Sequence, residues 1–161
     1  MEKVKLQDII DEMEIQMDEH HKYLNTETGK IITISSEDLD IAEDSEEDDD
    51  FLEYPDWQRE SIDAAIDVLI NWCSGKYIEL PSKWDINEYR IMEAFCGFIS
   101  NDKISTGLYS AIRGRGAFRR FKDAIFRYGV EDSWYQFRYE AFKKLAIEWC
   151  EHNRVLYDQS E

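Results

Sequence analysis

The residues best suited to chemistry are arginines gathered in one short window, residues 113–127. This window holds six of the 19 basic residues of the chain and a single acidic one, Asp123, so its net charge is +5. The whole chain carries −17, which leaves −22 for the remainder. A block of one charge within a chain of the opposite charge needs an anionic partner, either internal or external. The window is therefore the candidate site.

The window also predicts a helix that opens at Gly116 and closes at Gly129. Its apolar residues recur at helical spacing and predict one buried stripe, formed by Phe118, Phe121, Ile125 and Tyr128. Small residues let the backbone approach an anion, and the first turn of a helix presents free N–H groups to it. Together these features predict an anion-binding or partner-binding site formed by Arg113, Gly114, Arg115, Gly116, Arg119, Arg120 and Lys122.

Two plainer interpretations of the window stay open. The anion can be a carboxylate of the same chain, which has 36 acidic residues, because the planar guanidinium suits such pairs. Asp123 is spaced to pair with only one neighbouring arginine at a time, and each such exposed pair contributes about 0.2–0.5 kcal/mol. The two glycines can also simply turn the chain between helices. No P-loop pattern follows them and no strand directly precedes Gly114, so nucleotide binding is not indicated.

The composition predicts one folded domain over residues 1–161. Apolar residues make up 43% of the chain and aromatic residues 14%, which is enough to build a core. Three widely separated cysteines favour a reducing compartment over a disulfide framework. The chain has no signal-peptide pattern, and no run reaches the roughly 20 apolar residues of a membrane span. We therefore expect a cytoplasmic protein that binds no membrane and carries no cofactor.

Residues 37–50 form an acidic run with ten acidic side chains and no basic one. Such a run repels itself and buries little apolar surface, so it predicts a flexible linker inside the domain. It lacks the glycine and glutamate positions of an EF-hand loop. The three histidines, His20, His21 and His152, lack the spacing of a helical metal pair. No metal site is predicted.

Apolar periodicity and turn residues place the other elements. We expect helices over 6–17, from Asp56 to Cys73, after Asp85, over 105–112, and from Asp132 or Ser133 onward. The last of these should bury Trp134, Phe137, Ala141, Leu145 and Trp149. A hairpin over 23–34, a strand ending before Pro81 and a short edge strand over 155–157 supply the sheet. The sum is an α+β fold in which about six helices pack on a small antiparallel sheet, formed by the N-terminal hairpin and one or two further short strands.

The stretch Gly114–Asp123, GRGAFRRFKD, resembles the signature of an uncharacterised bacterial protein family of unknown function, one of the UPF series. Segments 77–81, 85–92 and 146–150 support the resemblance. It covers most of the chain outside the acidic run. The resemblance implies a shared fold and implies no activity.

Three functions are compatible with these observations. The first is a non-enzymatic binding or regulatory module whose arginine helix engages an acidic partner protein, with the acidic run of the chain as an internal competitor. The second is phosphate or RNA binding through the same helix, which the −22 remainder opposes but which charge screening over about 10 Å at 0.1 M salt permits. The third is an enzyme with an anionic substrate. For it we identify neither a Gly-x-Ser-x-Gly turn nor a base, so no catalytic residue is predicted.

Overall fold

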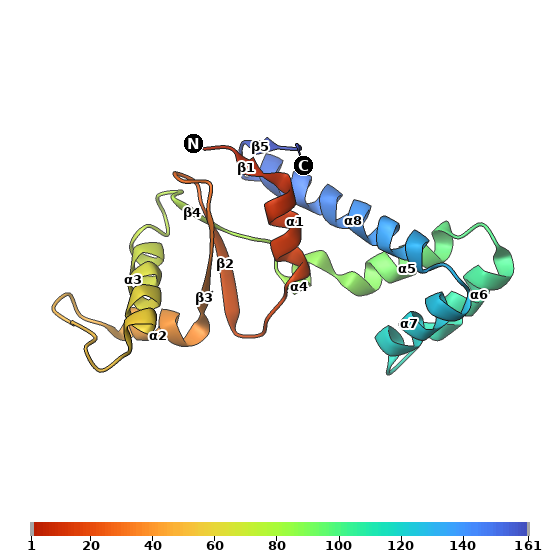
Figure 1. The fold of residues 1–161 in the computed structure, drawn as a ribbon, viewed down its shortest axis with the longest axis horizontal. Helices are drawn as coiled ribbons and strands as arrows, with labels where there is room; N and C mark the ends of the chain where they lie inside the picture. The colour runs from red at the N-terminus through yellow and green to blue at the C-terminus, as the bar shows by residue number, and fades with distance from the viewer. Residues whose placement is uncertain (1, 161) are drawn as a thin grey trace. The chain divides into compact units, whose positions relative to one another are not determined.

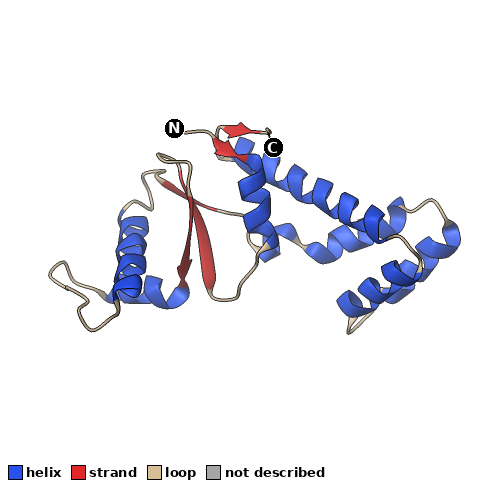
Figure 2. Cartoon of the chain, in the orientation of Figure 1, coloured by secondary structure: helices blue, strands red, loops and turns tan. Residues whose placement is uncertain are grey.

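A computed structural model describes residues 2–160. The chain divides into two compact units (Figures 1 and 2). Unit 1 comprises Met1–Ser82 and Ala146–Glu161, and unit 2 comprises Lys83–Leu145. The single domain expected over residues 1–161 stays a prediction. No helix formed by residues 2–160 is both long and apolar enough to cross a bilayer.

Unit 1 is built on a three-stranded antiparallel sheet. Its central strand β2 (His20–Asn25) pairs with β3 (Ile31–Ser35) on one side and with β4 (Tyr77–Glu79) on the other. The turn between β2 and β3 reaches Gly29 at a φ of 71°, where a side chain would strain the backbone. The predicted hairpin, the third strand and the α+β class are confirmed.

Three helices accompany this sheet: α1 (Leu6–Glu14), α2 (Ser36–Asp44) and α3 (Asp56–Ile70). Figure 1 shows α2 and α3 beside the hairpin. The sheet and these two helices share a core of buried side chains, formed by Tyr23, Ile34, Ala42, Ala65 and Val68. Helix α1 is shorter than predicted, and Met17, placed on its stripe, is half-exposed beyond its end.

Helix α2 occupies the first part of the acidic run, where the sequence indicated a flexible linker over 37–50. The Ser35 side chain accepts a hydrogen bond from the Asp38 N–H and so caps the helix. Carboxylates in the first turn are stabilised by the positive end of the helix dipole. Ala42 joins the core and Leu39 packs against it, which supplies the burial that charge counting overlooked. Residues 45–50 form turns and irregular structure.

A second, two-stranded sheet joins the two ends of unit 1. Strand β1 (Val4–Lys5) pairs in parallel with β5 (Tyr157–Asp158). The C-terminal tail was expected to add an edge strand to the hairpin sheet, and it pairs with the N-terminal segment instead. Val4 and Val155 are buried at this junction.

Unit 2 is helical. It contains α4 (Lys83–Ile86), α5 (Glu88–Phe98), α6 (Asp102–Ala111), α7 (Ala117–Arg127) and the first part of α8 (Glu131–His152). Its core contains a cluster of aromatic rings. Phe95 contacts Trp134 and Phe137, and Phe121 contacts Trp134, with ring centroids 4.7–5.4 Å apart. All three pairs have the edge-on geometry that aromatic rings prefer.

Two helix starts differ from the sequence expectation. Helix α5 is capped by Asn87, whose side chain accepts a hydrogen bond from the Arg90 N–H, and not by Asp85. Helix α8 begins at Glu131, ahead of the residues proposed as its cap. Of the predicted stripe only Trp134 is fully buried, whereas Phe137, Ala141, Leu145 and Trp149 are half-buried. The fully buried positions of the helix follow steps of eight and four residues; they are Trp134, Phe142, Ala146 and Cys150.

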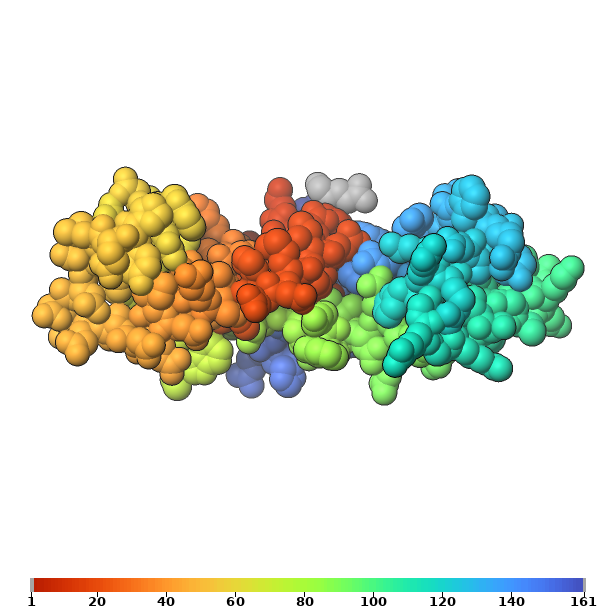
Figure 3. All heavy atoms as spheres, turned by 90° about the horizontal axis from the view of Figure 1, so that it is seen from below, coloured from red at the N-terminus to blue at the C-terminus, as the bar shows by residue number. Residues whose placement is uncertain are grey.

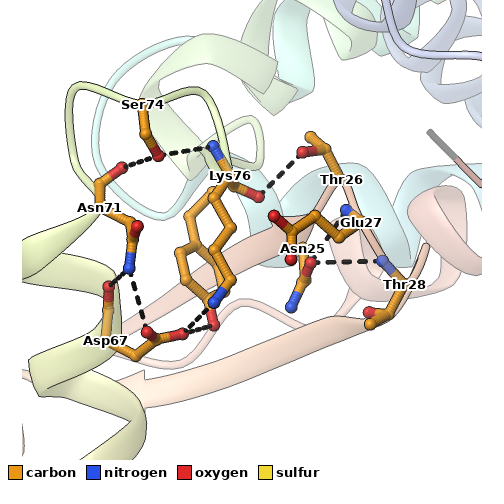
Figure 4. Close-up of polar contacts among 9 residues, drawn as sticks. Asn25, Thr26, Glu27, Thr28, Asp67, Asn71, Ser74 and Lys76 are labelled. Carbon is orange, nitrogen blue, oxygen red and sulfur yellow. Dashed lines mark hydrogen bonds and ion pairs between the residues drawn. The ribbon is translucent and has the colours of Figure 1, made fainter.

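A polar network ties the end of α3 to the start of β4 (Figure 4). The Asp67 carboxylate accepts hydrogen bonds from Lys76 Nζ at 2.8 Å, from the Tyr77 hydroxyl and from Asn71 Nδ2 at 3.0 Å. The hydrogen bond from Lys76, followed by that from Tyr77, lowers the pKa of Asp67. The network holds the 71–76 turn in place.

This lowered pKa predicts an acid-sensitive contribution to stability. The unfolded state binds the proton more readily than the folded state, so the stabilisation is complete above the ordinary carboxyl pKa of about 3.9 and is lost as the pH falls through the lowered pKa. We expect Asp67→Asn to lower the free energy of unfolding by about 0.2–1 kcal/mol at neutral pH, because both side chains of the pair remain partly exposed, and to have no effect at strongly acidic pH. Urea unfolding at both pH values measures this, with Asp63→Asn on the same helix as the control. Equal losses at both pH values would contradict it.

The cysteines differ in burial. Cys73 is exposed, whereas Cys96 and Cys150 are buried, and burial raises the pKa of each of these two thiols to about 11. Only the thiolate attacks a disulfide reagent. We expect a thiol-reactive disulfide to modify Cys73 rapidly in the folded protein and the other two only after unfolding. Rapid modification of all three in native buffer would contradict the burial.

Candidate arginine-helix site

The site is built on α6, a glycine-containing loop and α7, all within unit 2. Asn101 caps α6 by accepting a hydrogen bond from the Ile104 N–H. The chain then reverses through Gly114 and Gly116, whose φ values of 73° and 75° a residue with a Cβ rarely adopts. The two helices approach closely at Gly107, where a Cβ would collide with the hydroxyl of Tyr128. The prediction that Gly116 opens α7 is confirmed.

The far end of α7 closes in a Schellman motif. The Gly129 N–H donates to the Phe126 carbonyl and the Val130 N–H donates to the Ile125 carbonyl. Gly129 has a φ of 67°, as this motif requires. The sequence therefore determines both ends of the arginine helix.

Aromatic packing fixes the rotation of α7 about its axis. The Phe121 ring lies 4.7 Å from Trp134 and 6.2 Å from Phe95, both in edge-on contact. The buried positions of the helix are Ala117, Phe121, Ala124 and Ile125. The predicted stripe was correct for Phe121 and Ile125 and wrong for Phe118, whose exposed fraction is 52%. Ala117 and Ala124 are buried on this side of the helix, where the larger side chain of Phe118 was expected.

This rotation turns a mixed aromatic and basic surface outward, here called the α7 face and formed by Phe118, Arg119, Lys122 and Phe126. Helical spacing puts these residues on one side of the helix, and all four are exposed, Phe126 at 75%. Figure 3 shows the segment that contains α7, in teal, at the surface in this view. Large exposed apolar side chains among charges are typical of binding surfaces.

Arg120 has a different role from the other predicted site residues. Its guanidinium donates to the carbonyl of Ala111 at 2.9 Å and to the carbonyls of Arg113 and Arg115. It thereby joins the end of α6 to the glycine loop. These hydrogen bonds engage each of its nitrogen atoms, so Arg120 shapes the loop and is less able to bind a ligand.

The other cations of the window differ from Arg120 in their surroundings. Within residues 2–160, no carboxylate forms an ion pair with Arg113, Arg115, Arg119, Lys122 or Arg127. All five side chains are exposed, and Arg127 lies over the Tyr128 ring at 5.3 Å. In the part of the chain that the structure describes, these cations lack the carboxylate partner that internal pairing requires.

A second surface of α7 faces α6. Arg120, Asp123 and Arg127 line one wall of a cleft of about 270 Å³, and α6 lines the other with Gly107, Ser110 and Ala111. Helical spacing places these three charged residues on one side of α7. Asp123 forms no ion pair there within the described residues.

The charge of the protein is strongly divided between its units. Unit 2 holds 12 basic and 8 acidic side chains, a net charge of +4. Unit 1 holds 7 basic and 28 acidic side chains, a net charge of −21. The cations of α7 are therefore part of a basic unit within an acidic protein.

The model of an uncharacterised protein family, UPF0158, matches residues 3–160. The chain belongs to this family. No curated protein and no solved structure matches it. This membership confirms the predicted resemblance to an uncharacterised family of the UPF series. Because a fold does not define an activity, the function has to be argued from the site itself.

Two features of this UPF0158 chain escaped the sequence analysis. The outward position of Phe118 and Phe126 depends on the rotation of α7, which only the packed core determines. The second feature is a contact between His21, Ser36 and Glu79, three residues far apart in the sequence. Their spacing carries no signal, since β-sheet pairing and the start of α2 bring them together.

Proposed function

We propose that this UPF0158 protein is a binding or regulatory module that engages an acidic partner protein through the α7 face. The observation that carries the proposal is the set of exposed, unpaired cations interleaved with two exposed phenylalanines on one helix. Arginine and aromatic residues are the side chains that dominate the energy of many protein interfaces. Charge supplies attraction and orientation, and the two rings supply apolar area to bury.

The chemistry of the face favours an acidic segment that also carries apolar side chains. Arg119 and Lys122 lie between Phe118 and Phe126 on the helix, so carboxylates and apolar groups must alternate on the partner over about two turns. RNA also offers anions and flat bases, but repulsion from a chain of −17 grows with the charge of the ligand. The protein therefore repels a short acidic segment less than it repels an RNA strand with many phosphates.

Site-specific crosslinking tests the proposal. A photoreactive phenylalanine analogue at Phe126 is compared in cell lysate with the same analogue at Phe98, which is 63% exposed in the same unit. We expect a protein with an acidic segment to crosslink from position 126 and not from position 98, and to do so after nuclease treatment. Crosslinks that disappear with nuclease would replace the proposal by RNA binding. The same products from both positions would refute it.

A further inference from the structure

Three side chains of unit 1 meet in the order serine, histidine, glutamate. The Ser36 Oγ lies 3.0 Å from His21 Nε2, and His21 Nδ1 lies 3.4 Å from Glu79 Oε1. His21 is on the central strand β2, Glu79 is on the neighbouring β4, and Ser36 is the first residue of α2. The sheet thus fixes the histidine and the glutamate, and the strand-to-helix turn fixes the serine.

This order is that of a nucleophile, its base and the group that orients the base. When Nδ1 of His21 carries the proton and donates it to Glu79, Nε2 is free to accept the hydrogen of the Ser36 hydroxyl. Such an arrangement is recognised by geometry and not by order in the sequence. The neighbouring His20 has a different partner, because its Nδ1 lies 2.9 Å from the Asp18 carbonyl.

The start of α2 supplies a donor for a developing oxyanion. The Ser36 N–H donates to the Glu19 carbonyl at 2.7 Å, and the Asp38 N–H donates to the Ser35 hydroxyl. Between them, the N–H of Glu37 has no hydrogen-bond partner within the described residues. The N–H that follows the nucleophile is one of the oxyanion donors in hydrolases with a strand–serine–helix turn. Here β3 ends at Ser35 and α2 begins at Ser36, so the serine also lies between a strand and a helix.

Ser36 also lines a cleft of about 560 Å³ in unit 1. The cleft walls include Ile41, Phe51 and Tyr54, which can contact the apolar part of a ligand. They also carry six acidic side chains and no basic one: Glu19, Glu37, Asp40, Asp44, Asp49 and Glu53. An anionic substrate would be repelled from such walls, and an uncompensated oxyanion would be destabilised by them. A substrate with a positive charge removes both difficulties.

We propose that Ser36, His21 and Glu79 form the catalytic triad of a hydrolase for esters that carry a cationic group. Ser36 Oγ attacks the ester carbonyl carbon as its proton passes to His21 Nε2. The carbon–oxygen bond of the leaving group then breaks, and the alcohol departs with that proton. Water attacks the acyl-serine by the same route, which returns the proton to Ser36 and releases the acid. This activity goes beyond binding by α7, since it uses residues of unit 1 only.

A fluorophosphonate probe tests the nucleophile in the full-length folded protein. The Ser36 oxygen displaces fluoride from phosphorus, and peptide mass spectrometry locates the adduct. We expect labelling at Ser36, none in Ser36→Ala, and a rate lowered about 10²–10⁴-fold in His21→Ala, because the base is lost. His20→Ala, on the same strand, should label like the wild type. Circular dichroism confirms that each variant is folded, and His21→Ala tests the triad with the serine still present.

Esterase assays test the substrate class. The p-nitrophenyl ester of an ω-amino acyl group should be cleaved faster than that of the uncharged acyl group of equal length, and Ser36→Ala should abolish the difference. Asp40→Asn together with Asp44→Asn should narrow the preference by raising KM for the cationic ester. The proposal is overturned if the folded wild type takes up no probe, if the adduct lies on another residue, or if His21→Ala labels like His20→Ala.

Discussion

Replacing Phe121 with alanine is expected to lower the free energy of unfolding by about 3–5 kcal/mol, the usual cost of truncating a buried aromatic residue. The side chain is 1% exposed and its ring contacts Phe95 and Trp134. Two of the other buried positions of α7 are alanines, Ala117 and Ala124, whose side chains are too short to fill the resulting cavity. Urea denaturation followed by circular dichroism measures the loss.

Phe118→Ala is the matched control on the same helix. Phe118 is half-exposed, so the substitution should change the free energy of unfolding by no more than about 0.5 kcal/mol. If the two variants lose similar stability, the rotation assigned to α7 is incorrect, and the α7 face with it. The contrast therefore tests the packing on which the proposed binding surface depends.

Local signals in the sequence determined the ends of α7 but not its rotation. Gly116 and Gly129 predicted the boundaries because positive φ at a helix end is a local property of the backbone. Phe118 and Phe121 are equally apolar. Periodicity alone therefore does not show whether the buried side of the helix is centred on Phe118 or on Phe121. The fit of Phe121 between two rings of other helices decides between them, and that fit is a long-range property.

Charge counting misjudged the acidic run for a related reason. The net charge of the run accounts only for repulsion among its side chains. Ala42 and Asp38 are nevertheless buried through contacts with α3, which the sequence of the run does not indicate. Asp38, for example, accepts a hydrogen bond from Gln58 Nε2 at 3.1 Å. The Ser35 cap was a local signal for this helix. In contrast, the contact of His21 with Ser36 and Glu79 spans 15 and 58 residues of sequence, so only the sheet register could predict it.

Reversing the charges of the α7 face is expected to abolish binding of the crosslinked partner. Arg119→Glu with Lys122→Glu would place carboxylates against the carboxylates of an acidic segment, and such juxtaposition costs several kcal/mol. We therefore expect the affinity to fall by about 100-fold or more, because each 1.4 kcal/mol changes it tenfold. Isothermal titration with the purified partner measures this. The free energy of unfolding should be unchanged to within about 0.5 kcal/mol, since both side chains are exposed and neither forms an ion pair with another described residue.

The control reverses two other exposed cations of unit 2, Lys103 and Lys144, with the same change in net charge. If net charge alone governs binding, both pairs of substitutions weaken the affinity equally. If the α7 face is the site, only the first pair does, and the wild-type affinity declines as added salt shortens the screening length below about 10 Å. Equal effects of the two pairs would leave a basic unit with no specific surface and would remove the reason to assign recognition to α7.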